Sequence, residues 1–248
     1  MPQKDEQLIQ LLCTVLPERR RGKRGPAPLP KKALVRALFW WLRTGCAWRY
    51  VEHSASVRRY FFELQRRGIL LKNLKSIISL KYRPHIAIAD TTNINTWINA
   101  PLSSYSGKYH NHCTKLLLFI TNDSSICHFS LYTGSLHDSK IFDKYISQTQ
   151  KLPYELFLDK GFESYPRRRF LKSRNCQVRM QQRHYANNKK RGPRFLFSHA
   201  HKKTRVQVES HFSYLKAFHL FRYFRFRKRS TLNLALYIAL FLLFHPDL

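Results

Sequence analysis

Two aspartates and one glutamate stand where a fold could bring them together for chemistry. Asp90 ends a short apolar run, residues 85–90, that is typical of a strand, and Asp159 ends another such run. Glu209 is isolated in a basic stretch, because no Asp or Glu occurs between Glu163 and Glu209 while Lys and Arg recur there. These three acids are therefore candidate site residues.

Three carboxylates in an otherwise basic region would form a hard, oxygen-only ligand set. Mg²⁺ and Mn²⁺ prefer such ligands, and Mg²⁺ fills its remaining positions with water and phosphate. Two such ions can activate the attacking oxygen and stabilise the leaving oxygen at a phosphodiester. We expect Asp90, Asp159 and Glu209 to be both the catalytic and the metal-binding residues, with two Mg²⁺ or Mn²⁺ ions as cofactors.

Two cations share the helical face of Glu209. At about 100° per residue, Arg205, Glu209 and Lys216 lie within roughly 40° of one another on a helix. Arg205 and Lys216 would contact phosphate oxygens beside the scissile bond, where one bidentate and one point-charge donor offset negative charge. The simpler alternative makes Glu209 a surface partner of Arg205, worth about a few tenths of a kcal/mol.

The charge balance indicates a polyanionic partner. The chain has 248 residues, with 45 Lys and Arg against 14 Asp and Glu, and a formal net charge of +31. Hydrophobic residues make up 44%, enough for a buried core, so the charge does not indicate disorder. Nucleic acid is the leading partner. A protein that coats nucleic acid without chemistry has the same composition, so composition leaves both classes open.

Cysteine usage and hydropathy argue against export and membrane insertion. The five cysteines are scattered without a CxxC pair, which favours reduced thiols over a zinc or disulfide framework. The first residues lack a signal-peptide pattern. The most apolar run, residues 232–244, is too short to span a bilayer and predicts a buried helix. We expect a cytoplasmic, nucleoid-associated protein with no membrane partner.

The hydrophobic period changes along the chain and predicts two domains. Residues 1–78 predict a small all-α region of short helices that resembles a helix-turn-helix and would bind DNA; a plain helical cap is the alternative. Residues 79–248 predict three consecutive strands and then alternating helices and strands, an α/β fold with a mixed sheet flanked by helices. Such sheets build sites beyond strand ends, where Asp90 and Asp159 are expected. Asp138 is expected to cap the first helix after the three strands, or alternatively to support the ligands.

Sequence blocks in a fixed order resemble the DDE transposases of bacterial insertion sequences, in the insertion-sequence-five branch that is related to Harbinger-type transposases. Thr92, Phe162 and Lys202 depart from that family's pattern and leave the three acids intact. The blocks are TGCAWR (44–49), IADTTNI (88–94), YSGKYHNHCTK (105–115), TGSLHDSKIF (133–142), FLDKGFES (157–164) and RVQVESHFSYLK (205–216).

The resemblance implies a ribonuclease H-like catalytic domain and metal-dependent cleavage of DNA at terminal inverted repeats, followed by strand transfer of the 3′-hydroxyl ends into target DNA. It also implies a homo-oligomer, a dimer on paired transposon ends. Further DNA contacts are expected from cations within and near these blocks: Arg49, Arg58, Lys108 and Lys160. Two alternatives remain, an inactive or domesticated relative that only binds DNA, and a metal-dependent nuclease that cuts without joining.

Overall fold

The computed structural model describes residues 3–18, 29–68, 72, 84–108, 110–180, 199–223 and 226–243. Its contacts divide the chain into two compact units. The first contains Met1–Ile77, Asn95–Pro101 and Ser213–Leu248, and the second contains Ile78–Ile94 and Leu102–Phe212. The division into a DNA-binding region, residues 1–78, and a catalytic region, residues 79–248, is a statement about function and stays a prediction.

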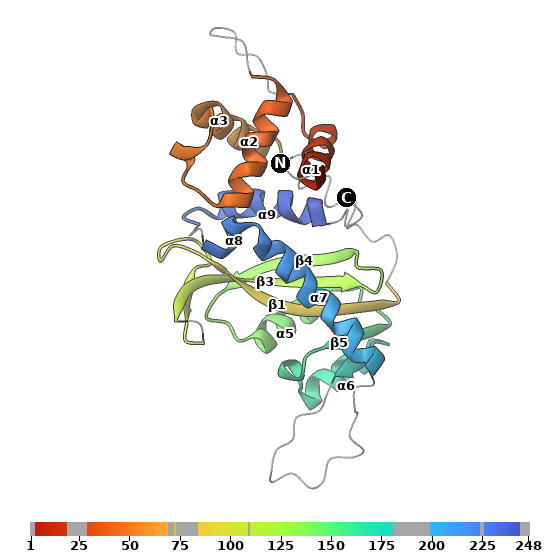
Figure 1. The fold of residues 1–248 in the computed structure, drawn as a ribbon. Helices are drawn as coiled ribbons and strands as arrows, with labels where there is room; N and C mark the ends of the chain where they lie inside the picture. The colour runs from red at the N-terminus through yellow and green to blue at the C-terminus, as the bar shows by residue number, and fades with distance from the viewer. Residues whose placement is uncertain are drawn as a thin grey trace. The chain divides into compact units, whose positions relative to one another are not determined.

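A mixed sheet forms the centre of the second unit (Figure 1). The strand order is β2-β3-β1-β5-β6, with β4 also paired to β3. The pairs β1–β5 and β5–β6 are parallel, whereas β2–β3 and β3–β4 are antiparallel. The predicted mixed α/β sheet is confirmed, and only the short β2 was not foreseen. The strands are β1 (Ile86–Asn95), β2 (Ser104–Ser106), β3 (Asn111–Thr121), β4 (Ile126–Thr133), β5 (Glu155–Leu158) and β6 (Gln177–Met180).

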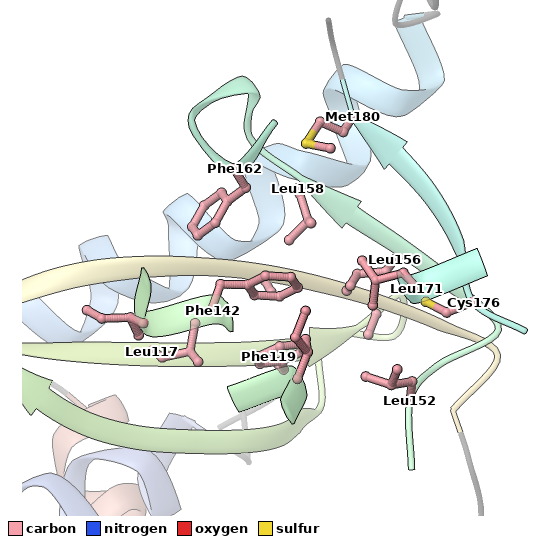
Figure 2. Close-up of a cluster of buried hydrophobic side chains, with 14 of the residues drawn as sticks. Leu117, Phe119, Phe142, Leu152, Leu156, Leu158, Phe162, Leu171, Cys176 and Met180 are labelled. Atoms are coloured by element: carbon pink, nitrogen blue, oxygen red, sulfur yellow. The ribbon is translucent and has the colours of Figure 1, made fainter. Parts of the chain in front are cut away.

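Helices cover both faces of this sheet (Figures 1 and 2). They are α5 (Asp138–Gln148), the short 3₁₀ helix η2 (Lys160–Phe162), α6 (Tyr165–Ser173) and α7 (His199–Ala217). α5 and α6 lie on one face and α7 on the other (Figures 1 and 2). Because each strand alternates its side chains between the two faces, both faces can be apolar, as a sheet covered on both sides requires.

The core of the second unit lies between the sheet and helices α5 and α6. Figure 2 shows Phe119 of β3 beside Phe142 of α5, with Leu156 of β5 near Leu171 of α6. The rings of Phe119 and Phe142 stack with centroids 6.2 Å apart. Burying each such side chain stabilises the fold by about 1.5–3 kcal/mol. This core holds β1 and β5 in position and thereby fixes the residues that follow their buried segments.

The first unit contains the described helices of the two chain ends. They are α1 (Gln3–Val15), α2 (Lys31–Thr44), the 3₁₀ helix η1 (Trp48–Tyr50), α3 (Ser54–Arg67), α8 (His219–Tyr223) and α9 (Arg229–Leu243). Trp41 of α2 stacks on Trp48 of η1 at 4.2 Å, and Phe61 of α3 meets the Trp41 ring edge-on at 5.3 Å. Gly45 ends α2 with φ +64°, the left-handed conformation that glycine adopts at low cost.

The apolar run predicted to be a buried helix is α9, and all but the last of its leucines are buried. No helix among the residues that the structure describes combines the length and the apolar character needed to cross a bilayer. The helix-turn-helix expected for the amino-terminal region stays a prediction.

Candidate active site

Two parallel strands place Asp90 and Asp159 side by side. β1 and β5 pair Ala89 with Leu158, so the residues that follow these two occupy the next position on neighbouring strands. Ala89 and Leu158 belong to the core on the α5 side of the sheet. Because extended chains alternate their side chains, Asp90 and Asp159 face the opposite side, where α7 lies.

Asp90 lies inside a strand, whereas the sequence predicted that it would end one. β1 continues as far as Asn95. The β-branched residues Thr91, Thr92 and Ile94 favour extended structure, which explains the continuation although the apolar run stops at Asp90. Asp159 directly follows the last residue of β5, as predicted, in extended backbone with φ −70° and ψ 155°.

Arg205 joins Asp159 to Glu209. Its Nη1 donates to Asp159 Oδ1 at 3.0 Å, and its Nη2 donates to Glu209 Oε1 at 2.9 Å. Arg205 and Glu209 lie one turn apart on α7, so the predicted helical pair exists. The Arg205–Glu209 contact is more than a simple surface pair, because the same guanidinium also binds Asp159 from the sheet. The fold therefore gathers Asp90, Asp159, Arg205 and Glu209 in one unit.

The surroundings of Asp90 alter its pKa. Burial raises its pKa from 3.8 to about 6, and the charge of Asp159 contributes in the same direction. A hydrogen bond from the Thr91 backbone N–H, 2.7 Å from Asp90 Oδ1, and the charge of Arg205 oppose the rise in pKa. A buried carboxylate beside a second acid favours a bound cation, and that is a property of metal-binding and catalytic sites.

Helix α7 is anchored on the sheet by both apolar and polar contacts. Val208 and Phe212 are buried. His211, only 8% exposed, places its Nδ1 2.9 Å from the Gln207 carbonyl oxygen and its Nε2 2.9 Å from the Ser124 carbonyl oxygen in the β3–β4 turn. His211 was missed in the sequence because nothing local distinguishes it. These contacts fix the face that carries Arg205 and Glu209.

The other predicted DNA contacts are spread over both units. Arg49 and Arg58 lie in the first unit, with guanidinium carbons 4.8 Å from the Tyr50 ring and 5.7 Å from the Phe62 ring, respectively. Lys216, in the last turn of α7, also belongs to the first unit, and burial lowers its pKa. Lys108 and Lys160 are exposed in the second unit; Lys160 directly follows Asp159.

The three acids have the donor chemistry that a divalent cation requires, but they are not gathered around one point. Within the described part of the chain, no group of three or more His, Cys, Asp or Glu is gathered as a metal site requires. The guanidinium of Arg205 is instead paired with both Asp159 and Glu209. Asp90 and Asp159 supply adjacent carboxylates, which are the ligands that Mg²⁺ and Mn²⁺ prefer.

Asp138 is a further acid, for which the sequence predicted either a helix cap or support of the ligands. It is the first residue of α5, and its charge contributes to the raised pKa of Asp90. The predicted capping role was wrong: His137 is the N-cap, and its Nδ1 accepts from the Ser139 backbone N–H at 3.2 Å. Instead, Asp138 Oδ1 accepts from Lys115 Nζ of β3 at 2.9 Å.

Comparison with known proteins identifies the family to which the chain belongs. The family model described as DDE superfamily endonuclease matches residues 87–243, which is more than half of the chain. The chain belongs to this family of endonucleases. No curated protein sequence matches it.

Solved transposase structures resemble the chain at low sequence identity. A piggyBac transposase synaptic complex with hairpin DNA aligns with a TM-score of 0.50 and 11% identity, over 98% of this chain and 71% of that chain. A Mos1 transposase paired-end complex aligns with a TM-score of 0.26 and 11% identity, over 65% of this chain and 61% of that chain. The first likeness shows a fold shared with a transposase, in agreement with the predicted α/β class.

Proposed function

We propose that the chain is a DNA transposase of the insertion-sequence-five branch, which cleaves DNA at the terminal inverted repeats of its element and transfers the 3′-hydroxyl ends into target DNA. Membership of the DDE superfamily endonucleases and the fold shared with piggyBac transposase support this proposal. The observation that carries it is the arrangement of Asp90 beside Asp159, with Glu209 connected to Asp159 through Arg205.

Asp90, Asp159 and Glu209 would hold two Mg²⁺ or Mn²⁺ ions. When bound, such ions activate the attacking oxygen and stabilise the leaving oxygen at a phosphodiester. Asp90 and Asp159 contribute from fixed strand positions, which limits how far their carboxylates can move. The side chain of Glu209 on helix α7 is about half exposed, so Glu209 is the ligand with freedom to approach the metal site.

Arg205 has two successive roles in this proposal. Before metal enters, its guanidinium neutralises Asp159 and Glu209. With carboxylates that hold a metal ion, Arg205 would be free to direct its two N–H donors to a phosphate oxygen pair of the DNA. The planar, bidentate guanidinium suits the charge that develops on the phosphoryl oxygens in the transition state.

The surplus of positive charge would bind the DNA that this site cuts. A net charge of +31 supplies a strong, salt-dependent attraction to the phosphate backbone. We assign the DNA-binding role to the amino-terminal region, residues 1–78, and further phosphate contacts to single cations. These are Arg49, Arg58, Lys108, Lys160 and Lys216. Two transposon ends must be held together for paired joining, so we extend the synaptic assembly of piggyBac transposase to a homodimer of this chain.

Cleavage of a labelled duplex that carries the element end tests the proposal. Wild type and Asp159→Asn are incubated with Mg²⁺ or with EDTA, and the products are separated on a denaturing gel. Cutting that needs both Mg²⁺ and Asp159, followed by joining to a second duplex, is the expected result. Cutting without joining would indicate a simple nuclease, and binding without cutting would indicate a relative that only binds DNA.

A further inference from the structure

Helix α3 of the first unit carries a stripe of arginine and aromatic side chains opposite its buried face. At about 100° per residue, Arg59, Phe62 and Arg66 lie within roughly 60° of one another, on the far side of the helix from its core residues. Arg59 and Arg66 are exposed, and Phe62 is half-buried. These three residues form the α3 stripe. The core residues of the helix are Val57, Tyr60, Phe61 and Leu64.

The positive charge of the α3 stripe is not neutralised within the described part of the chain. Glu63 is the only acid in the sequence of α3, and its side chain is just 18% exposed. Glu63 pairs with Arg67 at 3.5 Å, and both lie to one side of the stripe. Among the described residues, neither Arg59 nor Arg66 forms an ion pair with an acid. Both guanidinium groups therefore keep all their donors for a partner outside the protein.

Helix α2 carries cations of a different kind. Lys32 Nζ lies 2.7 Å from Glu6 Oε1, and Arg36 Nη2 lies 3.0 Å from Glu6 Oε2. Arg43 Nη2 donates to Asp5 Oδ1 at 2.6 Å. Both acids belong to α1, and α2 packs against α1 as well as α3 (Figure 1). The cations of α2 thus join helices inside the unit, whereas those of the α3 stripe face solvent.

The shape and spacing of the stripe suit the major groove of duplex DNA. That groove is about 12 Å wide and admits one α-helix. A hollow of about 440 Å³ is lined by Arg59, Phe62, Gln65 and Arg66. Arg59 and Arg66 are seven residues apart, which is about 10.5 Å along the helix axis and roughly three base-pair steps. Ala55 lies on the same face, exposed and too short to hold the helix away from the DNA.

The side chains of the stripe match base edges in chemistry as well. The planar arginine fork donates two hydrogen bonds to guanine O6 and N7, and an apolar ring contacts the methyl group of thymine. Arg58 flanks the stripe, with its guanidinium carbon 5.7 Å from the Phe62 ring. An arginine at the flank of a helix in the groove meets the phosphate backbone, which positions the helix but carries no sequence information.

We propose that α3 reads base pairs in the major groove of the element end, with Arg59 and Arg66 each donating to a guanine and Phe62 contacting a thymine methyl group between them. Arg58 contacts the phosphate backbone beside the groove. This inference rests on the proposed function, since it assigns to one helix the recognition of the terminal repeat. It makes Arg59 and Arg66 the specificity-determining residues.

Binding of the full-length chain to duplexes tests the proposal, measured by fluorescence anisotropy in EDTA so that no cleavage occurs. The probes are a duplex of the element end and a set in which each base pair is replaced in turn. Arg59→Gln and Arg66→Gln exchange a guanine-reading side chain for one that pairs with adenine. Each should lower the preference for one G·C pair by about five- to a hundredfold, or turn it into a preference for A·T. The two affected pairs should lie roughly three base pairs apart.

Two matched controls make the same chemical change on the same helix. Arg67→Gln removes an arginine that pairs with Glu63 to one side of the stripe, and its sequence preference should stay within about twofold of wild type. Arg58→Gln should weaken binding to all duplexes by the same factor and lower the slope of log affinity against log salt by about 1. Circular dichroism shows whether each variant has kept the helical content of wild type.

The outcomes separate this inference from the proposed function. Wild type that binds every duplex equally, or Arg59→Gln and Arg66→Gln variants that weaken all duplexes by one factor, would overturn the reading role of α3. If such a protein still cuts the element end with Mg²⁺ and Asp159, the proposed function stands without this inference. Variants that change the sequence preference of a protein that never cuts would support α3 as the reading helix and refute the transposase.

Discussion

Asp90→Asn should make the protein more stable in the absence of metal while abolishing cleavage. The folded protein raises the pKa of Asp90 from 3.8 to about 6, mainly by burial. Above that pKa, folding must keep a carboxylate ionised in a place that disfavours its charge. Asparagine has the same shape and an oxygen that accepts the Thr91 backbone N–H, but it carries no charge. The substitution therefore removes the electrostatic cost and the proposed metal ligand together.

The magnitude follows from the shift in pKa. A shift of about 2 units corresponds to roughly 3 kcal/mol, an upper estimate for a side chain with partial solvent access. The folded state holds the proton more tightly than the unfolded state, so the contribution of Asp90 is not unfavourable below pH 3.8. The cost grows as pH rises from 3.8 to about 6 and is nearly constant above that. The gain from Asp90→Asn should therefore reach about 2–3 kcal/mol at pH 8 and about half of that at pH 5.

Urea unfolding followed by circular dichroism, in EDTA at pH 5 and pH 8, measures this gain. Addition of Mg²⁺ should then stabilise wild type but not Asp90→Asn, because ligand binding adds stability only where the site exists. A variant that is equally or less stable than wild type at pH 8 would refute the electrostatic reasoning. So would a gain that does not depend on pH.

Three other substitutions give independent predictions. Arg205→Ala should retain or strengthen Mn²⁺ binding, because the guanidinium between Asp159 and Glu209 is gone, while cleavage falls by about 100-fold; weaker Mn²⁺ binding would contradict this. Arg167→Met should lower the free energy of unfolding by about 2 kcal/mol in urea, because the Phe162 and Ser139 carbonyl oxygens lose their donor from the buried Arg167, and a loss below about 0.5 kcal/mol would contradict it. Burial lowers the pKa of His128 to about 4, so the free energy of unfolding of wild type should fall by roughly 2–3 kcal/mol as pH falls from 6.5 to 4. His128→Phe should not show this fall, and a variant with the same pH profile as wild type would contradict the prediction.

The sequence predicted those parts of the site that depend on local pattern. An apolar run that ends in an acid predicted that a strand would stop at Asp159, and this prediction holds for β5, a short and mostly buried strand. Arg205 and Glu209 share a helix face because they are four residues apart, and the structure pairs them at 2.9 Å. The rule that a strand stops where its apolar run stops failed at Asp90, since the β-branched residues that follow Asp90 extend the strand.

Features that join distant segments could not be predicted. The contact of Arg205 with Asp159 depends on how α7 crosses the sheet, and no local pattern encodes that crossing. Lys115 and Asp138 stand on a strand and on a helix, so their pairing follows from the packing of the turn between β4 and α5. The grouping of Ser213–Leu248 with the amino-terminal helices is likewise non-local, because the hydrophobic period describes each helix and not its partner.

The most direct test of the central claim exchanges one ligand atom. Asp159→Cys replaces a hard oxygen donor with a soft sulfur donor, which Mg²⁺ disfavours and Mn²⁺ accepts more readily. The account predicts that this variant loses cleavage of the element-end duplex in Mg²⁺ and recovers part of it in Mn²⁺, while wild type cuts in both. Equal cleavage by the variant in Mg²⁺ and Mn²⁺, at the level of wild type, would show that Asp159 does not bind the catalytic metal and would contradict the account.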